Sequence, residues 1–230
     1  MGFLNYRQIE KEFLDYRNKD LWIFLSSKYE IGVNDDYRFY KLDYLDDLNP
    51  VYILTDKFYN KSLFTHELLH LELRSLEFDA SKSLPKSILL MSNEVERIRS
   101  QISYNLVNNA EHIIFIDRYL ELGFALQDFV ADYHTSNYPE SFFEQFNFLK
   151  YNPQLENLYS LFFLSSYVTM FSESKNQLNR QNEMSKLFEV NSDLYYKCES
   201  IGSLIENLNP YENRQAQVQL NNAFKKYLKD

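Results

Sequence analysis

Two histidines and a glutamate lie within five consecutive residues, and their spacing suits a metal site on a helix. Residues 65–70 read THELLH and contain the pattern HExxH. Residues four apart lie on one face of an α-helix, about one turn from each other, so His66 and His70 can direct their imidazole nitrogens at a single metal ion. Glu67 stands between them, beside the metal.

These residue types together support hydrolysis by a metal-activated water. Zinc bound by three protein groups keeps its fourth position for water and lowers the pKa of that water to about 7. A neighbouring carboxylate can then take the proton as the water attacks. The motif therefore predicts Zn²⁺ as the cofactor, His66 and His70 as two of its ligands, and Glu67 as the catalytic base. The alternative is an amphipathic helix whose histidines bind no metal.

The residues that precede the motif support the metal interpretation. Residues 50–56, PVYILTD, are β-branched and aromatic and follow a proline, which predicts a strand one short loop ahead of the motif helix. This arrangement resembles the zincin metallopeptidases, in which the edge strand of a small sheet lies above the HExxH helix and receives an extended substrate. The resemblance covers roughly residues 50–125 and implies a protein or peptide substrate.

The resemblance also implies a third metal ligand from a later helix, where two adjacent residues compete for the role. A glutamate from a helix well downstream is the gluzincin pattern, so Glu111 is our first choice. His112 is the alternative ligand, because histidine is scarce in this chain. The two side chains point about 100° apart on a helix, so only one can face the metal squarely. If His112 is not a ligand, we expect it to support a ligand or contact the transition state. Asn108 lies on the same side of the helix as Glu111 and could orient Glu111 through a hydrogen bond.

Three other residues are further alternatives. In small zincins of the ImmA/IrrE type the third ligand lies closer to the motif, at the separation that Glu94 or Glu96 would give. Both residues also fit the acidic first turn of a helix capped by Ser92. His134, the remaining histidine, could stabilise an oxyanion from a loop.

The composition favours a mainly α protein. Only four glycines and five prolines occur in 230 residues, which leaves few tight turns, while 45% of the residues are hydrophobic and can fill a large core. Strands are predicted over residues 37–42 and 51–56, and a turn over residues 31–36. Hydrophobic periodicity and turn residues predict helices over residues 6–28, 59–78, 87 or 92 to 122, 125–134, 140–149, 153–173, 175–189, 192–208 and 211–228. Gly123 is expected to end its helix in the left-handed conformation.

We therefore expect an α+β fold, with a small N-terminal sheet over the HExxH helix and a helical C-terminal half. Residues 1–125 would form the zincin-like core, and residues 126–230 a helical extension packed on it; the alternative is one continuous domain. The extension could instead serve a regulatory or toxin-antitoxin-like module that binds a partner with little or no catalysis. A helical interaction protein that binds no metal is the third possibility.

Charge and cysteine content narrow the range of partners and compartments. The formal net charge is −9, so the chain is repelled by phosphate backbones, and we expect no nucleic acid partner. A single cysteine, Cys198, allows no internal disulfide and suits a reducing compartment. The first residues lack a secretory pattern, and the apolar run over 158–171 is too short and too rich in serine to span a bilayer. We expect a cytoplasmic protein with no membrane partner; the sequence leaves its oligomeric state open.

Overall fold

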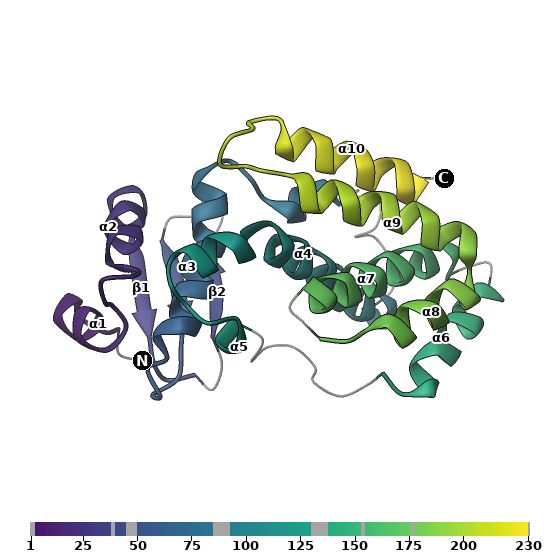
Figure 1. The fold of residues 1–230 in the computed structure, drawn as a ribbon. Helices are drawn as coiled ribbons and strands as arrows, with labels where there is room; N and C mark the ends of the chain where they lie inside the picture. The colour runs from purple at the N-terminus through teal and green to yellow at the C-terminus, as the bar shows by residue number, and fades with distance from the viewer. Residues whose placement is uncertain are drawn as a thin grey trace. The chain divides into compact units, whose positions relative to one another are not determined.

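The structure, a computed structural model, describes residues 3–37, 40–44, 50–84, 93–129, 138–152, 155–175 and 178–229. In these ranges the chain is mainly helical, with a small sheet near its N-terminus, as the composition predicts (Figure 1). The strands are β1 (Ile31–Asn34), β2 (Lys41–Tyr44) and β3 (Val51–Leu54). The helices are α1 (Tyr6–Glu12), α2 (Lys19–Lys28), α3 (Lys61–Ser75), η2 (Ala80–Ser83, a 3-10 helix), α4 (Asn93–Glu121), α5 (Leu126–Phe129), α6 (Glu140–Lys150), α7 (Glu156–Lys175), α8 (Gln181–Val190), α9 (Ser192–Asn207) and α10 (Ala216–Lys229).

The sheet has the strand order β1-β3-β2, with β3 parallel to β1 and antiparallel to β2. Val33 pairs with Ile53, and both side chains are fully buried. The prediction of a turn over residues 31–36 was wrong for its first four residues. They form β1 because the distant strand β3 supplies hydrogen-bonding partners that no local signal reveals. Gly32 permits this pairing, since a Cβ there would lie only 3.0 Å from the Tyr52 ring.

The second strand is displaced from its predicted position. We predicted a strand over residues 37–42, and β2 instead begins at Lys41. Residues 38 and 39 lie outside the described ranges. Tyr37 lies in a loop, where its backbone N–H donates to the carbonyl of Thr55 at 3.1 Å.

The helix predicted over residues 6–28 is two helices, α1 and α2, joined by a short turn. The buried side chain of Asn18 stabilises this break. Its amide nitrogen donates to the carbonyl of Phe13 at 2.9 Å, and its amide oxygen accepts from the backbone N–H of Asp15 at 2.9 Å. These bonds satisfy backbone groups that a continuous helix would have paired, which is why the helix stops here.

The two long helices on which the motif residues were expected are confirmed. Asn60 caps α3 by accepting the backbone N–H groups of Ser62 and Leu63. The next helix, α4, has 29 residues, and Gly123 follows it with φ of 88°, as the glycine cap predicts. A positive φ costs glycine little, so the chain can turn sharply after the helix.

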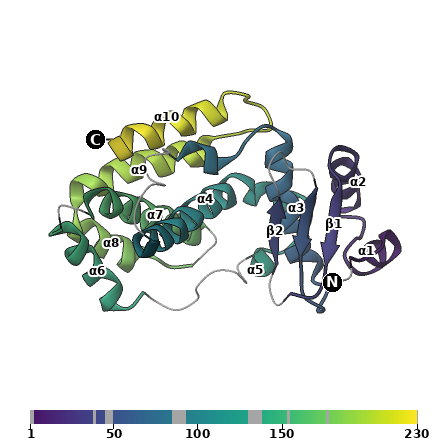
Figure 2. The same ribbon diagram turned by 180° about the vertical axis from the view of Figure 1, so that it is seen from behind.

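The chain forms two compact units, one of residues 1–77 with 115–132 and one of residues 78–114 with 133–230. The first contains the sheet, α1 to α3, α5 and the end of α4. The second contains the beginning of α4 and the later helices, among which α7 packs against α6, α8, α9 and α10 (Figures 1 and 2). The predicted division into a core over 1–125 and an extension over 126–230 stays a prediction.

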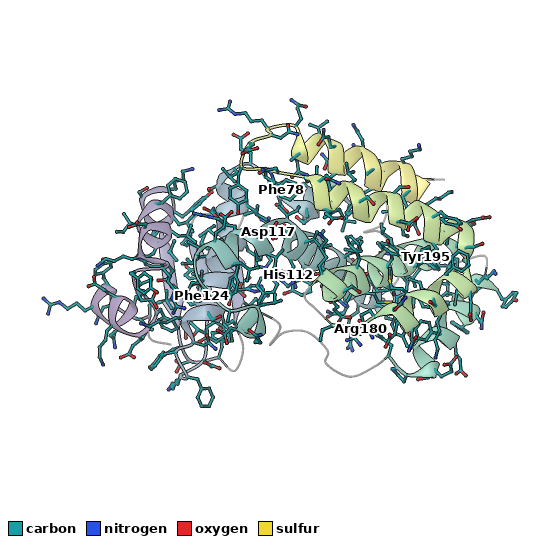
Figure 3. All side chains as sticks on the ribbon, in the orientation of Figure 1. Phe78, His112, Asp117, Phe124, Arg180 and Tyr195 are labelled. Atoms are coloured by element: carbon teal, nitrogen blue, oxygen red, sulfur yellow. The ribbon has the colours of Figure 1, made fainter. Side chains whose placement is uncertain are left out.

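Charged groups are buried inside the second unit as pairs. Arg180 donates from Nε to Glu173 at 2.7 Å, and both side chains are 2% exposed (Figure 3). The hydroxyl of Tyr138 also donates to Glu173, at 3.2 Å. Since an unpaired charge would be costly here, these bonds fix the chain where α7 gives way to α8.

None of the helices described for this chain is both long and apolar enough to cross a membrane.

Cys198 should be chemically silent in the folded protein. Its side chain is fully buried on α9, and its thiol donates to the Tyr227 hydroxyl on α10 at 3.3 Å. Burial raises the pKa of Cys198 to about 12, so at pH 8 roughly 1,000-fold fewer molecules carry the reactive thiolate than for an ordinary cysteine. We expect no reaction with a disulfide reagent in buffer and one thiol per chain in urea. Stoichiometric labelling of the folded protein would contradict this packing.

Candidate metal centre

The two motif histidines converge as their spacing predicts. On α3, His66 and His70 lie one turn apart, with 3.2 Å between their Nε2 atoms and 5.0 Å between ring centroids. Two nitrogens that each bind a tetrahedral zinc at about 2.05 Å are about 3.3 Å apart. The separation in the structure therefore suits two nitrogens that share one ion.

His112, which Figure 3 labels on α4, belongs to the same candidate metal group as this pair. One ligand atom from each of His66, His70 and His112 lies within 4.8 Å of the other two, and all three side chains are buried. Among the residues that the structure describes, this is the group whose composition and spacing could hold a metal ion. Of the two adjacent residues proposed as third ligand, His112 is the one in the group.

Glu111, our first choice from the sequence, has a backbone hydrogen-bond donor as a partner. Its carboxylate is 1% exposed and accepts the backbone N–H of Ala80, the first residue of η2, at 3.1 Å. Glu111 does not belong to the group of three histidines. The difference follows from helix geometry, because neighbouring side chains diverge by about 100°.

The other candidate site residues differ in how far their side chains are buried. Glu67 is buried on α3 between the two histidines, and Asn108 is half-buried on α4. Glu96 is exposed in the first turn of α4, as expected of an ordinary acidic residue there. The side chain of Glu94 and all of His134 lie outside the described residues.

Two phenylalanines surround the motif imidazoles with apolar surface. The ring of Phe115 meets His66 and His70 edge-on, with centroids 5.5 and 4.8 Å away. Phe129, on α5, lies against the His66 ring at 5.0 Å, and neither phenylalanine is exposed to solvent. The sequence analysis missed both residues. Phe115 follows His112 by three positions on one helix face and could have been found, whereas Phe129 comes from a separate helix.

This environment keeps the ring of His66 in its metal-binding form. Burial, followed by the neighbouring His70, lowers the pKa of His66 well below its usual range. The neutral imidazole is the form that binds metals, because protonation occupies the ring nitrogen that would coordinate.

Hydrogen bonds inside the first unit hold α3 in place on both sides of the motif. The Asn18 amide donates to the hydroxyl of Thr65, the residue before His66, at 2.8 Å. One turn earlier, Ser62 shares a hydrogen bond with the buried Tyr119 hydroxyl of α4. Two residues after His70, Glu72 forms an ion pair with Arg118 of α4 at 3.7 Å. The motif is therefore anchored to α2 on one side and to α4 on the other.

Three buried imidazoles form a donor set that fits zinc. Nitrogen donors also suit copper, nickel and iron, so the set by itself defines a transition-metal site and not a particular ion. Zinc sites with three protein ligands use such imidazoles and leave the fourth position open.

The comparisons with known proteins found no match for this chain among protein-family models, curated proteins or solved structures. The arguments about function therefore rest on the residues and their geometry.

The position of His112 predicts which variant loses the metal. Changing His112→Gln should weaken Zn²⁺ binding by more than about 100-fold, since even the loss of a residue that supports a ligand lowers affinity about 10- to 100-fold. Elemental analysis after dialysis, followed by chelator competition, measures this. Glu96→Gln, an exposed change on the same helix, is the matched control and should bind like the wild type. Retention of zinc by His112→Gln with its loss in Glu111→Gln would make Glu111 the ligand.

Proposed function

We propose that this protein is a zinc-dependent peptidase in which His66, His70 and His112 hold the ion and Glu67 is the general base. The observation that supports this most directly is the convergence of the three imidazoles within 4.8 Å, with a glutamate next to His66 in the HExxH pattern. Three neutral nitrogen donors leave an ion with its full positive charge and one position for water.

The chain's own residues account for the remaining roles. When bound, zinc supplies a Lewis acid that lowers the pKa of its water to about 7. In this proposal Glu67, which is buried on the same helix as His66 and His70, accepts a proton from a nucleophile at the centre and passes it to the leaving amine. Phe115 and Phe129 exclude bulk water from the imidazoles, which strengthens electrostatic interactions at the centre.

An extended peptide is the substrate that the sheet favours. On the outer side of β1, Phe3 pairs with Asn34 in an isolated bridge, so that edge is partly covered. On the other side, β2 is the last strand of the described sheet, and it packs against α3. The free backbone groups of such an edge strand can pair with a substrate backbone and bind it with little selectivity for side chains. We also propose that the protein is cytoplasmic, because its single cysteine is buried and free. We propose no nucleic acid partner, because the net charge is −9.

A second function is favoured by the burial of the centre. The three histidines and Glu67 are each at most 6% exposed, whereas a peptidase must admit a peptide to its metal. A buried zinc ion that no substrate can reach would stabilise the fold without catalysis. The alternative is therefore a module that binds a partner through its helical part and uses the metal for stability.

Glu67→Gln separates the two functions. In a peptidase this variant should bind Zn²⁺ as the wild type does and lose cleavage by about 100- to 10,000-fold, the usual contribution of a general base. Cleavage of unfolded casein and of a peptide library, with and without chelator, measures the activity, and added Zn²⁺ should restore it after chelation. Metal binding with no cleavage by the wild type would favour the module, and full activity of Glu67→Gln would show that Glu67 is not the base.

A further inference from the structure

The carboxylate of Glu111 connects the helix that bears His112 to the segment that follows the motif helix. The carboxylate is buried and accepts the N–H of Ala80 at 3.1 Å. Asp79 caps η2, and its own carboxylate accepts the N–H of Ser81 at 2.9 Å. The first turn of η2 therefore donates one N–H to its own cap and another to α4.

The C-terminal helix α10 holds η2 from the other side through a closed set of hydrogen bonds. Gln217 accepts the N–H of Asp79 at 2.6 Å, and its amide nitrogen donates to Ser83 at 2.9 Å and to Asn221 at 2.7 Å. Ser83 in turn donates to Asn221 at 2.6 Å. Since Ser83 is fully buried, these polar groups would be costly to leave unpaired, and the set resists displacement of η2.

Helix geometry links this set to the metal centre. Glu111 and His112 are neighbours on α4, so their side chains diverge by about 100°. Holding the Glu111 carboxylate on η2 restricts the rotation of α4 about its axis close to His112, and that rotation affects the direction in which His112 points. The same contact keeps an anionic side chain from competing for the ion.

We propose that Glu111 is a positioning residue of the metal centre, and that Gln217 of α10 anchors the segment on which Glu111 acts. The inference rests on the proposed metal site, with His112 as the third ligand. The C-terminal helix would thereby control the affinity and the geometry of a site to which it contributes no ligand.

The conservative variant Glu111→Gln provides the test, because its amide oxygen can still accept the Ala80 N–H while the negative charge is lost. Glu111→Leu removes the acceptor. We expect Zn²⁺ affinity within about threefold of the wild type for Glu111→Gln and about 10- to 100-fold lower for Glu111→Leu, the range typical of residues that orient a ligand. Chelator competition measures both affinities.

The visible spectrum of the Co²⁺-loaded protein supplies a readout that a general loss of stability would not change. At saturating Co²⁺, Glu111→Leu should show altered band positions and intensities, because His112 approaches the ion differently, while Glu111→Gln should match the wild type. An unchanged spectrum and affinity for Glu111→Leu would overturn the inference. Loss of metal by Glu111→Gln beyond about 100-fold would overturn it as well, because a ligand and not a positioning residue behaves in that way.

Gln217→Leu on α10 tests the anchor and serves if Glu111→Leu does not fold. It should weaken Zn²⁺ binding about 10-fold and shift the Co²⁺ spectrum in the same direction. Gln219→Leu is the matched control, since Gln219 has the same side chain in the same helix but is exposed, and it should change neither quantity. If Gln217→Leu and Gln219→Leu had the same Zn²⁺ affinity and the same Co²⁺ spectrum, the proposed role of α10 would be overturned. A wild-type protein that binds no Zn²⁺ or Co²⁺ would instead refute the proposed metal site.

Discussion

The rotation of α4 about its axis is the constraint on which the proposed metal centre depends. On this helix His112 belongs to the candidate metal group, and the adjacent Glu111 accepts a hydrogen bond from the backbone of η2. A turn of about 100° would exchange the two side chains and replace a neutral nitrogen donor by a carboxylate. Three neutral imidazoles leave the ion its full charge, which favours polarisation of a bound group more than a set that includes a carboxylate.

Burial explains why this rotation has to be fixed by specific contacts. An isolated carboxylate in an apolar interior is strongly destabilising, so Glu111, at 1% exposure, needs hydrogen-bond donors. The backbone N–H of Ala80 is one such donor, and the side chains of α10 hold the segment that presents it. These polar contacts therefore add specific constraints to the apolar packing of α4, η2 and α10.

The burial of the three imidazoles is compatible with both a peptidase and a structural metal site. Apolar rings around the imidazoles favour neutral ligands and strong electrostatics, both of which assist a hydrolase. They also cover the centre, as a structural zinc site would be covered. Phe129 differs from the other ring in its origin. It lies against His66 from the short helix α5, and not from the helices that bear the three histidines.

Much of the site and the fold class could be read from the sequence, because the signals were local. The period of a helix brings His66 and His70 together wherever that helix lies, and the scarcity of glycine and proline predicts long helices. The sequence favoured Glu111 over His112, whereas the group that could hold a metal ion includes His112. It missed β1, whose partner β3 lies after β2 in the chain, and the break after α1, where Asn18 reaches Thr65 across 47 positions. Spacing along one helix thus determined the pair of histidines, whereas the membership of His112 in the candidate group came only from the tertiary structure, because only packing sets how one helix is rotated against another.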